Sequence, residues 1–245
     1  MNTFIPLYES LFEVKIAETD SEIKAVQNLR YQVYVEERQW EPENETQLER
    51  DTYDSQSIHL LLIFKPENIP IGTARIILSN PSNIHRSYPV QEVCNHPMFW
   101  DRSWVRQHPE FSRFAIPKKR REYCLSHPLV LEAISNCGGD EKKTLFNLAM
   151  GLSFGLITKM AEVLRFKHFD GTCAVLEKSL LRLLSKNGLR VTPLGKPVEH
   201  HGVRQPCYIE VNCLENLVSN PDTLLGQMIY RYCLNQEDVK RIVNI

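Results

Sequence analysis

A long segment near the middle of the chain, residues 140–165, is apolar on nearly every side of the helix that it predicts. Its apolar side chains do not form a single stripe; they are Leu145, Phe146, Leu148, Leu152, Phe154, Leu156, Ile157 and Met160. Such a helix has to be covered on most sides, so the fold must place a sheet or other helices around it. The most apolar part, residues 148–157, is too short to span a bilayer, and we expect no transmembrane segment.

Strands and helices alternate in the rest of the chain. Alternating or apolar runs predict strands over residues 11–17, 57–64, 73–78, 110–116 and 168–176, and a strand pair that turns near Gly202. A capping box formed by Thr19 and Glu22 predicts a helix through about Gln39. A shorter helix ends near Asn187, with Gly188 as its stop.

Three stretches lack a strong period. Residues 79–109 and 117–140 are predicted to be loops, and residues 214–245 are predicted to form one or two small helices with Pro221 at a first position. The order of the elements predicts an α/β (α+β) fold with a mixed sheet in a single domain over residues 1–245.

The composition excludes several classes of protein. The hydrophobic and charged shares, 42% and 24%, are typical of a globular protein. A net charge of −1 gives no general attraction to nucleic acid, and we expect no nucleic-acid partner. The N-terminus lacks the layout of a signal peptide, and the seven cysteines include no CxxC pair, so we expect reduced, mostly buried thiols and a cytoplasmic location. A catalytic thiol stays open, and without an HExxH-like spacing we expect no metal.

Charged residues inside apolar elements are the strongest sign of a site. Arg30 lies in the apolar stripe of the first helix, and Arg75 and Arg113 lie in strands. A buried guanidinium keeps its charge and needs carboxylates or carbonyls as partners. The nearby carboxylates are Glu49, Asp51, Asp54 and Glu110. These residues predict a connected ion network, which is either purely structural or part of a functional site.

Glu110 and Arg113 set a condition on the strand that carries them. In a regular strand, residues three apart face opposite sides. For both to line one site, the strand needs a bulge near Phe111 or Ser112.

Eight positions resemble the signature of acyl-homoserine-lactone (autoinducer) synthases. They are Arg30, Tyr34, Trp40, Asp51, Asp54, Arg75, Glu110 and Arg113. Those enzymes usually carry phenylalanine where this chain has Tyr34. The stretches RYQVYVEERQWEP, ERDTYD, GTARIIL, EFSRFAIPKKRR and GLRVTPLGKPVEHHGVRQPCYIEV look closer still to N-acyl amino acid synthases, and within them to the acyltransferases associated with PEP-CTERM/exosortase systems.

The resemblance implies a GNAT fold, with a mixed twisted sheet and helices on both faces. It covers a core of about residues 10–212 and leaves residues 213–245 as a C-terminal helical extension. It also implies an acyl thioester donor on acyl carrier protein or coenzyme A, an amine acceptor and no bound cofactor. The phosphate loop (R/Q)xxGx(G/A) is missing after the strand 110–116, which favours acyl carrier protein as the donor and partner.

The resemblance also assigns roles to the residues. Glu110 would take the proton from the amine, and Arg30 and Arg113 would orient the carboxylates or bind the carboxylate of the acceptor. Tyr34 and Trp40 would cover the acceptor. The other substrate-site residues would be Asp51, Asp54, Arg75, Phe111 and Ser112.

Two features outside that set have open readings. The run Lys118, Lys119, Arg120 and Arg121 is either a set of solvated loop charges or a docking patch for acyl carrier protein. Gly151 and Gly155 indicate close packing of the long helix, or room for an acyl chain beside it.

Two alternatives to an N-acyl amino acid synthase remain. One is an acyl-homoserine-lactone synthase with S-adenosylmethionine as the acceptor. The other is a GNAT-like module that binds lipid or carrier protein without turnover. Both are tested by the products that the protein forms.

Overall fold

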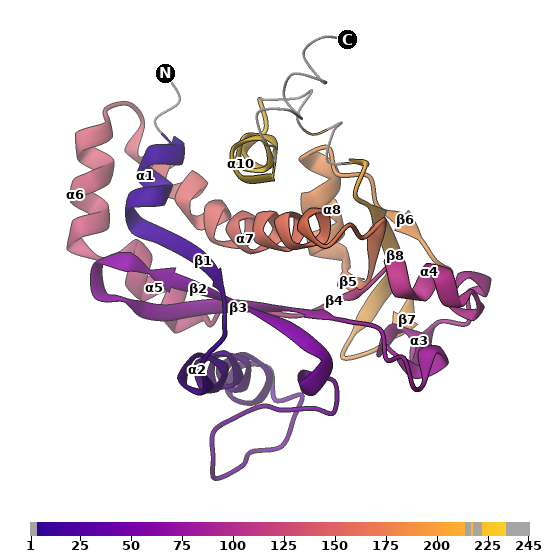
Figure 1. Ribbon diagram of the computed structural model, residues 1–245. Helices are drawn as coiled ribbons and strands as arrows, with labels where there is room; N and C mark the ends of the chain where they lie inside the picture. The colour runs from indigo at the N-terminus through magenta and orange to yellow at the C-terminus, as the bar shows by residue number, and fades with distance from the viewer. Residues whose placement is uncertain (1–3, 214–216, 218–221, 234–245) are drawn as a thin grey trace. The chain divides into compact units, whose positions relative to one another are not determined.

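A computed structural model of the chain describes residues 4–213, 217 and 222–233 (Figure 1). The helices are α1 Phe4–Leu11, α2 Asp20–Tyr31, α3 Val90–Val93, α4 Arg102–Gln107, α5 Lys118–Leu125, α6 Pro128–Cys137, α7 Glu141–Phe166, α8 Lys178–Lys186 and α10 Leu224–Cys233. The strands are β1 Phe12–Ile16, β2 Ser57–Phe64, β3 Ile69–Ile77, β4 Glu110–Ala115, β5 Gly171–Glu177, β6 Thr192–Pro193, β7 Val198–Glu199 and β8 Val203–Glu210. Hydrogen bonds join them in the order β1-β2-β3-β4-β5-β8-β6, with β7 paired to β8.

The sheet is mixed, as predicted. β1 is antiparallel to β2, β4 is parallel to β5, and β5 is antiparallel to β8. The chain forms two compact units that alternate along the sequence. The first unit holds Met1–Asp51, His59–Ala74 and Arg113–Lys159, and the second holds Thr52–Ile58, Arg75–Ser112 and Met160–Ile245.

In the first unit, helix α2 packs on strand β2. Its buried residues Val26 and Leu29 join Leu61 and Ile63 of β2 in one apolar cluster. The predicted capping box is confirmed, since Thr19 accepts a hydrogen bond from the backbone of Glu22 and the Glu22 side chain accepts in return. The helix therefore starts at a defined residue and presents one face to the sheet.

The predicted helix over residues 19–39 changes type part of the way along. After Tyr31 it continues as a π-helix, η1, over Gln32–Glu37. The Arg38 amide donates back to the Val33 carbonyl at 3.0 Å, five residues earlier, and Gln39 has a left-handed φ of 54°. π-Helical turns are rare and frequent at functional sites, and this one carries Tyr34.

Helix α7 confirms the central apolar helix, but the space beside its two glycines is filled. A Cβ atom on Gly155 would overlap the Tyr8 hydroxyl, and one on Gly151 would lie 3.0 Å from the Phe4 ring. Both rings come from α1, which the sequence pattern did not predict. Close packing is therefore the correct interpretation of Gly151 and Gly155, and no acyl chain fits against them.

The length of α7 corrects one step of the sequence argument. The helix has 26 residues, and it is long and apolar enough to cross a membrane by length and composition alone. Half of its most apolar stretch is buried inside the protein, as in a core helix. One such helix is weak support for a membrane span, and the absence of a transmembrane segment stays a prediction.

In the second unit, β4 begins beside β5. Glu110 pairs with Cys173 and Phe111 with Ala174, while β5 pairs with β8 from Gly171–Glu210 to Glu177–Arg204. The predicted turn near Gly202 is confirmed, since this residue links β7 to β8 with φ 95°.

Residues 79–109 are not the loop without helices that the sequence predicted. They hold the short helices η4 Ile84–Arg86, α3, η5 Pro97–Trp100 and α4. Their buried side chains join Ile77, Cys173 and Leu194 in one apolar cluster; they are Ile84, Tyr88, Val90, Cys94, Phe99 and Val105. Each of these helices has only three to six residues, so none leaves a clear helical period in the sequence.

The prediction of a loop over residues 117–140 is also wrong. This segment forms helices α5 and α6, which contact each other. Only Cys124 of α5 is buried, so its run of cations leaves no apolar stripe for a periodicity argument to find. At the C-terminus, α10 is one of the small helices that were predicted for residues 214–245, and Pro221 lies outside the described residues.

Candidate functional site

The first unit contains a buried cluster of arginines and carboxylates centred on Glu49. Arg30 is fully buried on α2 and its Nε donates to Glu49 Oε2. Arg113 lies 3.1 Å from Glu49 Oε1 and 3.0 Å from Asp51 Oδ2. Glu49 therefore joins two of the predicted arginines. The sequence named it among the candidate carboxylates but did not place it in the site.

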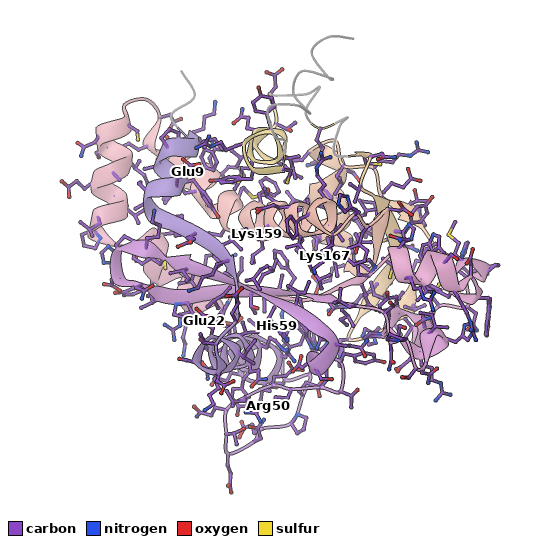
Figure 2. The ribbon with its side chains drawn as sticks, viewed as in Figure 1. Glu9, Glu22, Arg50, His59, Lys159 and Lys167 are labelled. Carbon is purple, nitrogen blue, oxygen red and sulfur yellow. The ribbon has the colours of Figure 1, made fainter. Side chains whose placement is uncertain are left out.

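Backbone contacts with α2 fix the segment that brings Glu49 and Asp51 to the cluster. The Glu49 amide donates to the Gln27 carbonyl at 3.1 Å, and Arg50 Nε donates to the Gln27 side chain at 2.8 Å. Asn28 donates to the carbonyl of Gln47 at 3.1 Å. Figure 2 shows Arg50 on the loop that passes α2. The carboxylates are thus held by the helix that carries Arg30.

Two aromatic rings lie between two cations beside this cluster. The Arg113 guanidinium lies 5.2 Å from the centre of the Tyr34 ring, whose centre is 5.6 Å from that of Trp40. Arg38 lies 5.3 Å over the Trp40 ring. Cations are attracted to ring faces at such distances. Tyr34 and Trp40 are therefore in contact, and their role in covering the acceptor stays a prediction.

The charge of Arg113 is well supported. Burial of the guanidinium works against its charge, but Glu49, Tyr34 and Asp51 outweigh that effect and raise the pKa of Arg113. The residue stays a cation that binds the two carboxylates.

Strand β4 is irregular one residue beyond the positions at which a bulge was expected. Arg113 itself has a left-handed φ of 50°, while the bulge was expected near Phe111 or Ser112 and stays a prediction. A bulky residue in this conformation is unusual and costs on the order of 1–3 kcal/mol.

In the second unit, Glu110 begins β4 and is 3% exposed. Its Oε2 accepts a hydrogen bond of 2.8 Å from the backbone amide of Val90, at the start of α3. Its charge also acts on Tyr88 and Cys173 and raises the pKa of each, in addition to the larger effect of burial. The segment that the sequence treated as a loop is therefore what holds the candidate catalytic carboxylate.

Arg75 forms a buried ion pair in this unit. Its Nη1 lies 2.5 Å from Asp54 Oδ1, and its Nε donates to Ser112 Oγ at 3.0 Å. Asp54 belongs to the turn η2 Asp54–Gln56 directly before β2. Phe111, the remaining predicted residue, is half-buried in β4.

The predicted residues thus fall into one group in each unit. Arg30, Tyr34, Trp40, Asp51 and Arg113 gather in the first, and Asp54, Arg75, Ser112, Phe111 and Glu110 belong to the second. Charged partners for every buried arginine were predicted, and Arg30, Arg75 and Arg113 each have one.

The buried thiols do not favour nucleophilic catalysis. Burial raises the pKa of Cys207 and of Cys124 to about 12, and that of Cys173 well above its ordinary value. A thiol that keeps its proton is a poor nucleophile. All seven cysteines carry thiols that are not joined in disulfides, and six are buried. Among the described residues, no group of three or more metal-binding side chains gathers, and the absence of a metal stays a prediction.

The cationic run forms the first turns of helix α5. Lys118, Lys119 and Arg121 are exposed, and Arg120 is half-buried. The Lys118 amide donates to Glu37 at 2.6 Å, which fixes the start of the helix. The cations are therefore presented on a defined helix.

The fold places the chain in a class: it is GNAT-like, with a mixed sheet and helices that match solved structures along most of their length. Residues 29–127 match the family profile described as an acetyltransferase (GNAT) domain. Among curated proteins, none matches the sequence.

Three solved structures define the similarity more closely. TofI, solved in a ternary complex with an inhibitor and MTA, is 20% identical with a TM-score of 0.58, over 87% of this chain and 97% of that chain. The CoA-dependent acyl-homoserine lactone synthase BjaI, solved with SAM and isopentyl-CoA, is 18% identical with a TM-score of 0.57, over 96% and 99%. FeeM, an N-acyl amino acid synthase from uncultured soil microbes, is 17% identical with a TM-score of 0.52, over 88% and 97%. At these identities the similarity shows the fold, and the GNAT fold expected from the sequence is confirmed.

Proposed function

We propose that the protein is an N-acyltransferase that moves a fatty acyl group from a thioester to the amine of an amino acid or a similar small acceptor. The observation that carries the proposal is Glu110, a buried carboxylate at the start of β4 that the Val90 amide holds in place. The match of residues 29–127 to GNAT domains and the likeness of the fold to FeeM support the same class of reaction.

The reaction needs a base and no covalent intermediate. The neutral amine attacks the thioester carbonyl carbon, a C–N bond forms, and the C–S bond breaks with release of the thiolate. The amine gives up one proton, which Glu110 accepts through a water molecule and the leaving thiolate finally takes. A positioned base of this kind contributes roughly 10²–10⁴-fold to the rate.

We propose acyl carrier protein as the preferred donor, with the cations of α5 as its docking patch. A cluster of exposed lysines and arginines suits an acidic partner. Coenzyme A is the alternative, and BjaI is described as CoA-dependent. We further propose that the protein acts in the cytoplasm and belongs with the PEP-CTERM/exosortase-associated acyltransferases.

The ion pairs of Arg30 and Arg113 suggest how the acceptor is bound. Arg30 and Arg113 are each already paired with a carboxylate of the chain. We propose that they hold Glu49 and Asp51 in place, with Tyr34 and Trp40 against the acceptor. Direct pairing of an arginine with the acceptor's carboxylate is the alternative, and it predicts that amino acid amides are poor acceptors.

A product screen tests the proposal. The pure protein is incubated with acyl carrier protein thioesters or acyl-CoA, and with amino acids, amino acid amides or S-adenosylmethionine, and the products are read by mass. Acyl amides of amino acids are expected. If acyl-homoserine lactone forms from S-adenosylmethionine and no amino acid is acylated, the activity is that of an autoinducer synthase. The absence of any product, together with tight binding of the acyl donor, would indicate a binding module.

A further inference from the structure

A patch of arginines and one tryptophan lies exposed on the short helices of the second unit. Trp100, at the end of η5, is 66% exposed. Its ring centre is 5.6 Å from that of His85, which belongs to η4. Arg86, Arg102 and Arg106 are exposed on η4 and α4, and α4 contacts both η4 and η5. We call these five residues the Trp100 patch. No role in the proposed reaction uses them.

The patch lies over one apolar cluster. Each of its three elements places one residue in the same apolar cluster: Ile84 from η4, Phe99 from η5 and Val105 from α4. The exposed His85, Trp100 and Arg106 directly follow these three buried residues in the sequence. The exposed side chains therefore gather over one core, beside the helix labelled α4 in Figure 1.

The cations of the patch are available to an outside anion. Among the described residues, no carboxylate forms an ion pair with Arg86, Arg102 or Arg106. The two acids in this segment are already engaged. Asp101 accepts from the amides of Ser103 and Trp104, and Glu92 accepts from the Tyr53 hydroxyl at 2.8 Å.

We propose that the Trp100 patch docks the protein on an anionic membrane surface. Tryptophan is favoured at the membrane–water interface, where its ring meets the acyl boundary and its N–H meets water. Guanidinium groups pair with lipid phosphates. A membrane surface is the occupant that uses both chemistries, because the indole anchors at the acyl boundary while the guanidinium groups pair with the phosphates above it. Membrane contact also suits the proposed function, because a fatty acyl amide dissolves in a bilayer, although the docking does not depend on that reaction.

Sedimentation with lipid vesicles tests the patch directly. The full-length protein is mixed with vesicles of phosphatidylcholine alone, or of phosphatidylcholine with phosphatidylglycerol. Binding is expected to the anionic vesicles only, and to weaken as salt screens the charges. Each guanidinium lost should weaken binding roughly fivefold, so R102E/R106E should abolish most of it. W100A should weaken binding at low and high salt alike, and the blue shift of tryptophan fluorescence on binding should disappear in W100F.

A matched charge reversal at the start of α7 controls for net charge. K142E/K143E changes the charge by the same amount at two exposed lysines and should bind anionic vesicles as the wild type does. The proposal would be overturned if the wild-type protein does not bind anionic vesicles, or if R102E/R106E still binds them normally. Loss of carrier-protein binding in R102E/R106E, with vesicle binding unchanged, would overturn it in favour of a protein dock. The assay contains no acyl donor or acceptor, so its result is independent of whether the proposed reaction occurs.

Discussion

Glu110 combines deep burial with a well-defined donor, the Val90 amide at 2.8 Å. Replacing it with glutamine keeps an oxygen for that donor but removes the base. We expect E110Q to fold normally and to lose roughly 10²–10⁴-fold in kcat, measured by product formation with saturating acyl donor. E92Q, which changes an exposed glutamate of α3, is the control and should retain full activity. An E110Q rate equal to that of the wild type would remove Glu110 from the mechanism.

Glu49 is the residue on which the first unit's ion cluster depends. Without its carboxylate, the fully buried Arg30 loses a charged partner and Arg113 keeps only Asp51 among its ion pairs. Breaking a buried pair from one side typically costs about 3–5 kcal/mol, and we expect E49Q to lower the free energy of unfolding by that amount in urea titrations.

The control for Glu49 is the exposed Glu45 on the same loop. E45Q should change stability by no more than about 0.5 kcal/mol. A similar loss in both variants would mean that the loop, and not the buried charge, determines the effect.

At the scale of elements, α1 and α7 fit together through Gly155. Alanine favours a helix interior over glycine by about 1 kcal/mol, yet its methyl group here would meet the Tyr8 hydroxyl. We expect G155A to cost about 1–3 kcal/mol of stability through overpacking, and Y8F/G155A to recover part of it. Denaturant unfolding of the four-member cycle measures the coupling. Additive effects of the two substitutions would show that the helices do not meet at this point.

The antiparallel pair of β5 and β8 should make stability sensitive to alkaline pH. Burial, and then the charge of Glu110, raise the pKa of Cys207 from an ordinary value near 9 to about 12. The folded state thus keeps a proton that the unfolded chain releases, so stability is full below pH 9 and falls as the pH rises towards 12. For one thiol the slope approaches about 1.4 kcal/mol per pH unit.

Replacing Cys207 isolates this contribution. C207A and C207S both remove the titrating group and should flatten the decline between about pH 9 and about pH 12, measured as unfolding free energy against pH. Cys173 shares the burial, so part of the decline should remain. A slope that does not change in either variant would contradict the expectation.

The elements with strong periods or caps were those that the sequence could predict. Strand β2 begins and ends where expected, at Ser57 and Phe64, and the capping box placed the start of α2 correctly. Helix α5 was missed because it has a single buried residue, and the short helices of residues 79–109 because their core forms only with distant partners such as Leu194. The π-helix was missed because no local residue preference signals it.

The candidate site was predictable to a similar degree. A buried guanidinium demands a carboxylate, so pairing of Arg30, Arg75 and Arg113 with acids followed from charge and periodicity. Which acid each arginine takes depends on backbone contacts, such as the bond between the Glu49 amide and Gln27, that no spacing reveals. The same holds for Val90, which supports Glu110 from a segment that was predicted to be a loop.

For the molecule as a whole, a net charge of −1 means that an acidic carrier protein gains little from the overall field. Any electrostatic attraction has to come from a local patch, and the proposed one is α5. We expect kcat/KM with acyl carrier protein thioesters to fall as salt is added, and this dependence to vanish in K119E/R121E.

A second reversal with the same charge change controls for that experiment. Lys142 and Lys143 are exposed at the start of α7, and K142E/K143E should keep the salt dependence of the wild type. If both double variants lose the salt dependence to the same degree, the total charge of the protein, and not helix α5, governs the encounter with the carrier protein. Retained salt dependence in K119E/R121E would place the carrier elsewhere.

The π-helix over Gln32–Glu37 has a consequence for comparing this chain with distant relatives. A turn that closes five residues back takes up one residue more than an α-helical turn, so Tyr34 and Trp40 owe their register to one additional residue. Deleting Gln32 should restore an ordinary helix and swing the following side chains by about 100° around its axis. Alignments that pass through this region without a gap would therefore equate non-corresponding residues in any homologue whose helix is regular here.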